Sequence, residues 1–207
     1  MSHEISITSR SQNTLFPIFL KLEQLHVLLV GGGKIGLEKL NAMLTNAPSA
    51  KINVVAEWLS DEIKQLAGAH SDVLLQQKNF EASDLEGKDV VIIAVNDRVA
   101  SLNIRNAAKQ RRLLVNVADT PDLCDFYLGA IVQKGAVKIA ISTNGKSPTL
   151  ARRLKEVLQQ TLPDAIHTLA DHLHAIRSRL KGDFATKVEA LNRITERLVE
   201  KEKTKSP

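Results

Sequence analysis

The sequence has few of the residues that mark secreted, membrane-spanning or aromatic-rich proteins. Cys124 is the only cysteine, so no disulfide can form within the chain, and we expect a cytoplasmic location. No apolar run reaches the roughly 18 residues of a membrane-spanning helix, and the polar N-terminus lacks the apolar region of a signal peptide. Aromatic residues make up 3% of the chain and hydrophobic residues 43%. The core is therefore expected to consist of Leu, Ile, Val and Ala.

Positive charge is concentrated in the C-terminal part of the chain. From Ala151 onward there are 12 Lys and Arg against 8 Asp and Glu, a net charge of +4, whereas the first 150 residues have 16 against 15. Such an excess fits nucleic acid, an anionic small molecule or simply a solvated helical surface, and the last explains most of these charges. Our interpretation is an anionic small-molecule partner, with no nucleic acid and no membrane.

Short apolar runs alternate with amphipathic segments over the first 118 residues. The runs are typical of buried parallel strands, and the segments between them have helical spacing. This alternation predicts βαβ units and an α/β fold with a Rossmann-type, doubly wound parallel sheet. The predicted strands are residues 25–30, 51–56, 73–77, 89–95 and 112–118, and the predicted helices are residues 37–47, 58–67 and 99–110.

The pattern changes near Asp119. Two strand-like runs around Lys134 and Gly135 predict a hairpin, and Ser147 can cap the helix that follows. Two further apolar stripes at helical spacing, separated by Gly182, predict a helical hairpin whose second helix Asp183 can cap. We therefore divide the chain into three segments: a Rossmann domain of residues 1–118, a hairpin region of residues 119–148 and a helical region of residues 149–207.

A glycine-rich turn follows the first predicted strand. Gly31, Gly33 and Gly36 form the pattern G-x-G-x-x-G, in which the glycines permit a tight turn, close approach of a pyrophosphate and close helix packing. Its position between a strand and a helix favours dinucleotide binding over a turn that only packs the junction. Glu57 lies 21 residues after Gly36, where an acid that binds ribose is expected, and no nearby Lys or Arg could receive a 2′-phosphate. We therefore favour NAD over NADP.

Three polar residues follow the later strands of the predicted sheet. Asn96 and Asp97 come after the fourth strand and Asp119 after the fifth, and ligands of such sheets lie outside these carboxyl ends. Asn96 and Asp97 are therefore predicted to contact the cofactor and Asp119 to face the crevice that holds it. The alternative for Asp119 is a turn residue whose side chain bonds local backbone.

Four segments of the sequence together indicate a family: LFPIFLKLEQLHVLLVGGGKIGLEKL, IIAVND, VNVADTPDLCDF and IAISTNGKSPTLARRLKE. They resemble the precorrin-2 dehydrogenase and sirohydrochlorin ferrochelatase family, the short siroheme synthases without a methyltransferase domain, and the resemblance covers roughly residues 14–160. It implies a Rossmann NAD domain, a strand-rich dimerisation region and a helical cap. It also implies a homodimer that oxidises precorrin-2 to sirohydrochlorin with NAD and, in bifunctional members, inserts ferrous iron to give siroheme.

The resemblance also assigns residues to roles. The essential aspartate of the family falls on Asp119, and its NAD contacts fall on Lys34, Ile35, Glu57 and Trp58. The acetate and propionate groups of precorrin-2 call for cationic partners and helix N-termini. The residues that we predict to bind substrate are Asn116, Lys146, Ser147, Arg152 and Arg153.

Several alternatives stay open at this point. One is a non-enzymatic NAD-sensing module, although such modules lack the carboxylate–proline turn, hairpin and basic helix found here; another is an NAD-dependent dehydrogenase of a different anionic small molecule. His167, Asp171 and His174 share one helix face and are of types that bind ferrous iron, but a polar helix border is the favoured reading and no metal site is predicted. Thr143 matches a position that is phosphorylatable in some family members.

Overall fold

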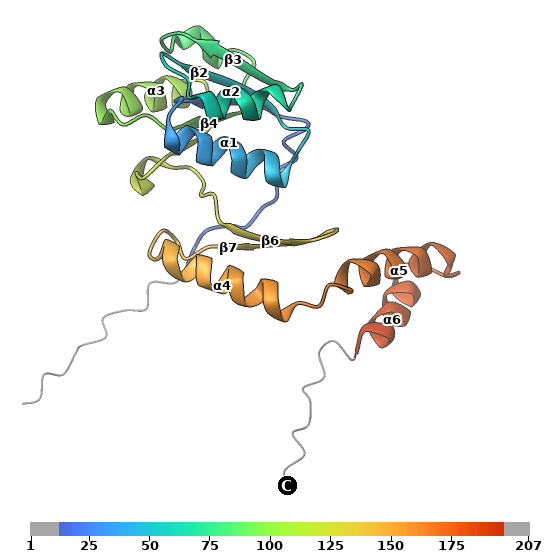
Figure 1. Cartoon of the computed structure of the whole chain (residues 1–207). Coiled ribbons are helices and arrows are strands. Elements are labelled where there is room, and N and C mark those ends of the chain that lie inside the picture. Colours follow the sequence, from blue (N-terminus) through green and yellow to red (C-terminus); the bar gives the residue numbers. More distant parts are fainter. Residues whose placement is uncertain (1–12, 197–207) are drawn as a thin grey trace, which may run out of the picture. The chain divides into compact units, whose positions relative to one another are not determined.

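The structure is a computed structural model that describes residues 13–196. Within this range the chain forms two compact units (Figure 1). The first comprises residues 13–128 and 144–146, and the second comprises residues 129–143 and 147–196. The three-segment division expected from the sequence stays a prediction.

The first unit is built on a parallel sheet of five strands in the order β3-β2-β1-β4-β5. This is the order of a doubly wound nucleotide-binding sheet, and it confirms the predicted Rossmann-type fold. All five predicted runs form strands. Their bounds are β1 His26–Val30, β2 Lys51–Ala56, β3 Val73–Gln77, β4 Val90–Ile93 and β5 Leu114–Val117.

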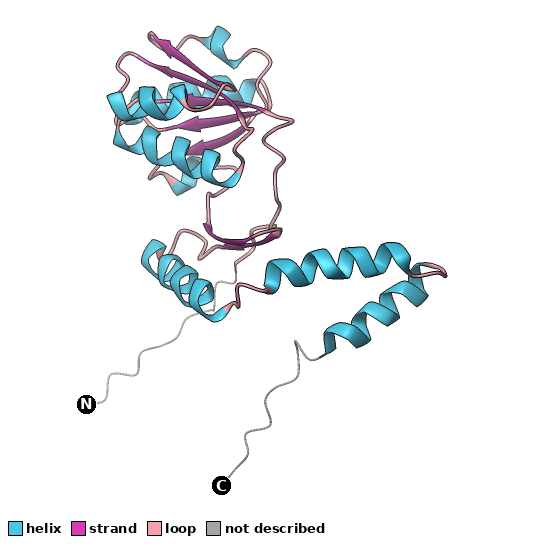
Figure 2. Ribbon diagram, turned by 45° about the vertical axis from the view of Figure 1, so that its right-hand side comes forward, coloured by secondary structure: helices cyan, strands magenta, loops and turns pink. Residues whose placement is uncertain are grey.

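Helices cover both faces of this sheet (Figure 2). Successive side chains of a strand point to opposite faces, so Val27 and Leu29 pack in the core beneath α1 and α2, whereas Leu28 and Val30 pack beneath α3. Both cores are aliphatic, as the composition predicts. The helices of this unit are α1 Lys34–Asn46, α2 Asp61–Gly68 and α3 Arg98–Gln110, with short 3₁₀ segments at η1 Ala82–Leu85 and η2 Pro121–Leu123.

The fourth and fifth strands are shorter than predicted because the chain leaves the sheet early. After the amide of Ala94 donates to Val30 O at 2.7 Å, the chain turns toward α3; after the amide of Ala118 donates to Ile93 O at 2.9 Å, it turns toward η2. Helix α1 begins earlier than predicted, since Leu37 N already donates to Gly33 O at 2.9 Å. The C-terminal ends of β4 and β5 and the N-terminus of α1 therefore lie at the same edge of the sheet.

The second unit combines an antiparallel hairpin with three helices. The hairpin turns at Gly135, where φ is +57°, and Ser147 and Asp183 cap α4 and α6 as predicted. Neither α5 nor α6 contains a buried residue: the predicted apolar stripe of α5 is half-buried, and Val188 and Ile194 in the stripe of α6 are exposed. The element bounds are β6 Ala130–Lys134, β7 Val137–Ile141, α4 Pro148–Thr161, α5 Ile166–Arg179 and α6 Phe184–Thr195.

Candidate active site

Two glycines of the motif are required by close packing at the end of β1. Gly31 has a φ of +127°, and a Cβ atom there would collide with the carbonyl oxygen of Ala94. A Cβ atom on Gly36 would collide with the carbonyl oxygen of Gly31, which brings the first turn of α1 directly onto the strand end. Side chains are therefore excluded at both positions.

Gly33 differs from these two because a Cβ atom there would meet open space. It is the N-cap of α1 and supplies no side-chain hydrogen bond, whereas Ser60 caps α2 and Asp97 caps α3 through its carboxylate. The unpaired amides and positive dipole end of α1 are thus left for an anion to approach. Lys34, which is exposed, and Ile35, which is half-buried, form the first turn beside this opening.

The predicted ribose acid follows β2 on the same edge. Glu57 and Trp58 are both exposed, with 62% of Trp58 accessible. Gly32, which the motif treats as a free position, ties them to the turn: a Cβ atom on it would collide with the carbonyl oxygen of Trp58, and its own carbonyl accepts from Ser60 N at 3.0 Å. In the sequence, only the presence of a third glycine at position 32 points to this close approach of Gly32 to Trp58.

The two residues after β4 differ in what their side chains do. Asn96 is exposed at the strand end. The carboxylate of Asp97 accepts from Val99 N at 2.7 Å and from Ala100 N at 3.0 Å, so it caps α3. This geometry gives Asp97 a structural role, and its contact with a cofactor stays a prediction.

Asp119 lies in a tight turn directly after β5. Thr120 N donates to Val117 O at 3.3 Å, and Asp119 sits inside that turn with a φ of +56°. Its side chain is exposed and has no hydrogen-bond partner within residues 13–196. The alternative in which this carboxylate bonds local backbone is therefore absent from the described structure, and the group is available to a ligand.

Asn116 lies two strand positions before the turn and is buried, with 6% of its surface exposed. Its amide nitrogen donates to Phe126 O at 2.8 Å. This contact gives Asn116 a structural role, and its contact with a substrate stays a prediction.

The segment of residues 144–146 belongs to the first unit and approaches the same turn. A Cβ atom on Gly145 would lie 3.9 Å from the ring of Pro121, so the backbone next to the exposed Lys146 approaches the turn that contains Asp119. An ammonium group at this place suits the carboxylates of an anionic ligand.

The other predicted substrate residues lie in the second unit. Ser147 accepts from Leu150 N at 3.1 Å and so caps α4. Arg152 and Arg153 are exposed and both pair with Glu156, at 3.7 Å and 2.6 Å. The hydrogen bond from Arg153 lowers the pKa of Glu156, which keeps this carboxylate ionised beside both guanidinium groups. Each arginine must share its charge between Glu156 and any anionic ligand.

The three residues considered for iron do not come together. His167 packs against the Gly135 turn and contacts the carbonyl of Asp164 through Nδ1, while His174 lies on the side of α5 that faces α6. No group of three or more metal-ligating side chains occurs among the described residues.

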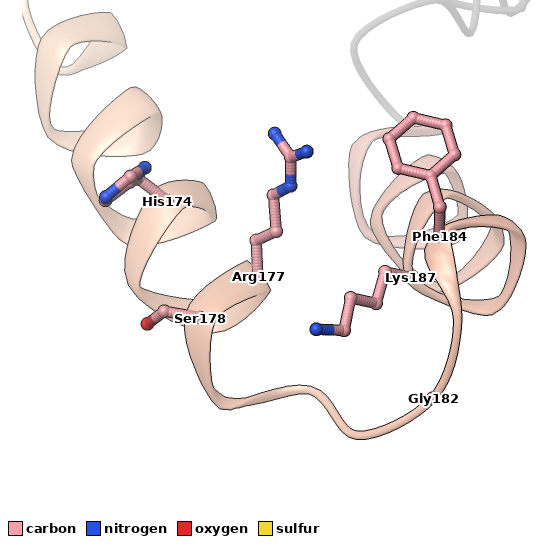
Figure 3. A pocket seen from close by; sticks show the side chains of 6 residues that line it. All are labelled: His174, Arg177, Ser178, Gly182, Phe184 and Lys187. Atoms are coloured by element: carbon pink, nitrogen blue, oxygen red, sulfur yellow. The ribbon is translucent and has the colours of Figure 1, made fainter.

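A hollow of about 400 Å³ lies between α5 and α6 (Figure 3). The guanidinium carbon of Arg177 lies 5.8 Å from the ring centre of Phe184, and none of the described residues that line the hollow is acidic. The lining residues are His174, Arg177, Ser178, Gly182, Phe184 and Lys187.

Thr143 lies just before α4. Its hydroxyl donates to Ser147 O at 3.1 Å and accepts from Ser147 N at 3.2 Å. The hydroxyl thus fixes the start of the helix, and modification of Thr143 stays a prediction.

Comparison with known proteins identifies the chain. Residues 18–130, more than half of its length, match a family model described as "Putative NAD(P)-binding", and residues 134–161 match one described as "Sirohaem biosynthesis protein central". The chain belongs to the NAD(P)-binding family of the first model, and its likeness to sirohaem biosynthesis proteins extends to the second. This confirms the resemblance that the four sequence segments indicate.

Curated siroheme synthases give the extent of the likeness. The chain is 39% identical over 165 residues to a siroheme synthase of Methylococcus capsulatus, covering 80% of this chain and 34% of that protein. It is 34% identical over 183 residues to siroheme synthase 3 of Aeromonas hydrophila, covering 88% and 38%. The chain thus spans about a third of the length of the curated relatives it matches.

A solved structure of similar length shares the fold. The structure of SirC, precorrin-2 dehydrogenase, has a TM-score of 0.69 and 28% identity, and the match covers 89% of this chain and 92% of that one. None of the helices within residues 13–196 is long and apolar enough to cross a membrane.

Proposed function

We propose that this chain oxidises precorrin-2 to sirohydrochlorin with NAD, as a step of siroheme biosynthesis. The observation that carries the proposal is the exposed, unbonded carboxylate of Asp119 at the sheet edge where α1 begins with an uncapped N-terminus. A sequence likeness to siroheme synthases and a structural likeness to SirC, precorrin-2 dehydrogenase, support the choice of substrate.

The turn after β1 would hold the cofactor. The amides at the start of α1, including those of Lys34 and Ile35, would bond its pyrophosphate, and Gly33 leaves the space for it. The carboxylate of Glu57, beside Trp58, would bond the ribose hydroxyls. NAD is preferred over NADP because the sequence has no Lys or Arg between Lys51 and Lys64 to receive a 2′-phosphate.

The reaction removes a hydride and a proton from precorrin-2. NAD supplies the acceptor of the hydride, and the chain must take up or direct the proton. Asp119 takes this proton as a general base, or holds the macrocycle so that water takes it. Its lack of an internal partner leaves the carboxylate oxygens to the substrate.

Cationic residues receive the carboxylates of the substrate. Lys146, near the Asp119 turn, is the first of these, and Arg152, Arg153 and the N-terminus of α4 at Ser147 are further partners. We also propose a cytoplasmic homodimer, in which a second copy covers the exposed apolar side chains of α4, Leu150 among them. Ferrochelation and ferrous iron as a substrate rest on the family resemblance alone and stay predictions.

One experiment separates this proposal from its rivals. Purified protein mixed with NAD and precorrin-2 should form NADH and sirohydrochlorin, both followed by absorbance. A sensing module would bind NAD without turnover. A dehydrogenase of another substrate would bind NAD but leave precorrin-2 unchanged, and either result would contradict the proposal.

A further inference from the structure

The outer edge of β5 is covered by the chain that returns from the Asp119 turn. β5 is the last strand of the sheet and pairs with β4 on one side only. On its other side Asp125 N donates to Val115 O at 2.8 Å, and Val115 N donates to the Asp125 carboxylate at 2.9 Å. Asp125 thus satisfies both backbone groups of Val115 that would otherwise be unpaired.

Cys124 supplies side-chain hydrogen bonds to the last residue of the strand, whose carbonyl also accepts from Thr120 N at 3.3 Å. Val117 N donates to Cys124 Sγ at 3.2 Å, and the thiol lies 3.2 Å from Val117 O, to which it donates. Burial raises the pKa of Cys124, so the thiol keeps the proton that this second bond needs. A neutral thiol can donate one hydrogen bond and accept another, so Cys124 can accept from Val117 N and donate to Val117 O, with Thr120 O at 3.4 Å as a second acceptor within reach.

An ion pair also attaches the returning chain to helix α3. Lys109, in the last turn of α3, lies 2.8 Å from both carboxylate oxygens of Asp125. We call Cys124, Asp125 and Lys109 the clasp. It joins α3, the edge of β5 and the returning chain mainly through side chains. A sixth strand at this edge would instead pair with β5 through backbone hydrogen bonds.

The clasp fixes both ends of the segment that carries Asp119. Only residues 118–123 lie between the end of β5 and Cys124, and within them Asp119 holds a φ of +56°. A non-glycine residue in this region is strained and persists where its surroundings enforce it. Pro121 O is held in turn by the hydroxyl of Tyr127 at 3.3 Å.

We infer that Cys124 and Asp125 are positioning residues for the oxidation, holding the turn so that the Asp119 carboxylate keeps its aim at the substrate. The inference rests on the proposed function, in which Asp119 acts on precorrin-2. A displacement of about 1 Å in a positioned group can lower turnover by roughly a hundredfold. Loosening the clasp should therefore reduce kcat while the separate NAD turn after β1 is unaffected.

The test compares variants of the full chain in precorrin-2 turnover and NAD affinity. Cys124→Ala and Asp125→Asn should lower kcat about 10- to 100-fold, with an unchanged Kd for NAD. Cys124→Ser replaces the thiol by a hydroxyl, which can also donate and accept a hydrogen bond, so its kcat should fall less than that of Cys124→Ala. Should Cys124→Ala fail to fold, Cys124→Ser and Asp125→Asn carry the test.

Asp84→Asn is the matched control for Asp125→Asn. Asp84 also accepts from a backbone amide, Glu81 N at 2.9 Å, and pairs with a lysine, Lys78 at 2.8 Å, in the same unit. Both variants should lose similar thermal stability, but only Asp125→Asn should lower kcat. Equal kcat values for the two variants would show that Asp125 only stabilises the fold and would overturn the inference.

A double-mutant cycle distinguishes positioning from general damage. If Cys124 acts through Asp119, the variant with both Asp119→Ala and Cys124→Ala should turn over no more slowly than Asp119→Ala alone. If the kcat of the double variant falls by the product of the two single losses, Cys124 does not act through Asp119 and the positioning role is overturned. An unchanged kcat in Cys124→Ala, while Asp119→Ala is inactive, would overturn the positioning role as well and leave the proposed function intact. Parental turnover in Asp119→Ala would instead overturn the proposed role of Asp119 and the inference with it.

Discussion

Asp119 combines a backbone conformation that favours glycine with a carboxylate that has no partner among the described residues. Natural chains keep such costly conformations most often where a ligand is bound or converted. Gly33 differs from Asp119 because it has no side chain although the space around it would admit one. Substitutions at these two residues therefore probe the chemistry and the cofactor separately.

Asp119→Ala should fold and bind NAD normally but lose about 10²–10⁴-fold in precorrin-2 turnover, the usual effect of removing a general base. Steady-state kinetics and a separate NAD titration measure the two properties. Asp119→Asn keeps the shape but cannot take up a proton at neutral pH. Restored activity in Asp119→Asn would show that the residue orients the macrocycle instead of accepting the proton.

Gly33→Asp should abolish NAD binding, because a side chain and a negative charge would occupy the place of the pyrophosphate. The fold should survive, since a Cβ atom at Gly33 meets no other atom within 4 Å. Calorimetric titration with NAD checks the affinity, and circular dichroism checks the fold. A folded variant that binds NAD as tightly as the parent would contradict the placement of the cofactor.

Single residues also show where the sequence falls short. The G-x-G-x-x-G spacing predicted a tight turn at Gly31 and close helix packing at Gly36, and the contact of Gly36 with Gly31 O is local to this turn. The sequence did not predict that the amide of Asn116 bonds Phe126 O, a partner brought to it by the reversal of the chain after β5. A contact of that kind depends on tertiary structure, which spacing alone does not reveal.

Among the elements, the helices differ in how their N-termini are satisfied. Ser60 and Asp97 cap α2 and α3 with their own side chains, while α1 begins at a glycine that offers none. The strand order puts the starts of α1 and α3 at the same edge of the sheet, next to β1 and β4. An anion at this edge thus finds one helix open and the other already occupied.

Asp97→Asn should keep both stability and NAD affinity, since Asn caps a helix about as well as Asp. Asp97→Ala should lower the free energy of unfolding by about 1 kcal/mol through loss of the cap. Chemical denaturation and NAD titration measure these effects. A weakened NAD affinity in Asp97→Asn at unchanged stability would mean that the carboxylate itself contacts the cofactor.

Helix α4 carries the two arginines predicted to meet the substrate. Replacing Arg152 and Arg153 together by Glu should raise the KM for precorrin-2 and leave the Kd for NAD unchanged, because the reversed charges repel the carboxylates of the substrate. Replacing Arg177 and Arg179 of α5 by Glu gives a control with the same change in net charge. Equal KM values for parent and variant would assign both arginines to their ion pairs with Glu156.

At the scale of the whole molecule, burial is divided unequally between the two units. The buried hydrophobic residues of the first unit form two aliphatic cores, whereas those described in the second unit are Val132 and Ala151. The sequence predicted every helix and strand of the second unit, since caps, turns and stripes are local signals. It could not show what covers the stripes, because periodicity marks an apolar face without naming its partner.

Hydrogen exchange should reflect this division. Amides of β1 and β4 should exchange only on global unfolding, while amides of α5 and α6 should exchange through local opening and therefore much faster. Mass spectrometry of peptides from both units measures the difference. Equally slow exchange in α5 and α6 would mean that another surface buries them in solution, and its dependence on protein concentration would identify a second copy.

The scarcity of aromatic residues gives the cofactor turn a built-in optical probe. The chain has one tryptophan, Trp58, and it lies exposed on the segment that Gly32 ties to the glycine-rich turn. All indole emission therefore originates beside the predicted ribose site, with no background from elsewhere in the protein. Quenching of this emission should report cofactor occupancy directly, without a label, in the parent chain and in every variant that retains Trp58.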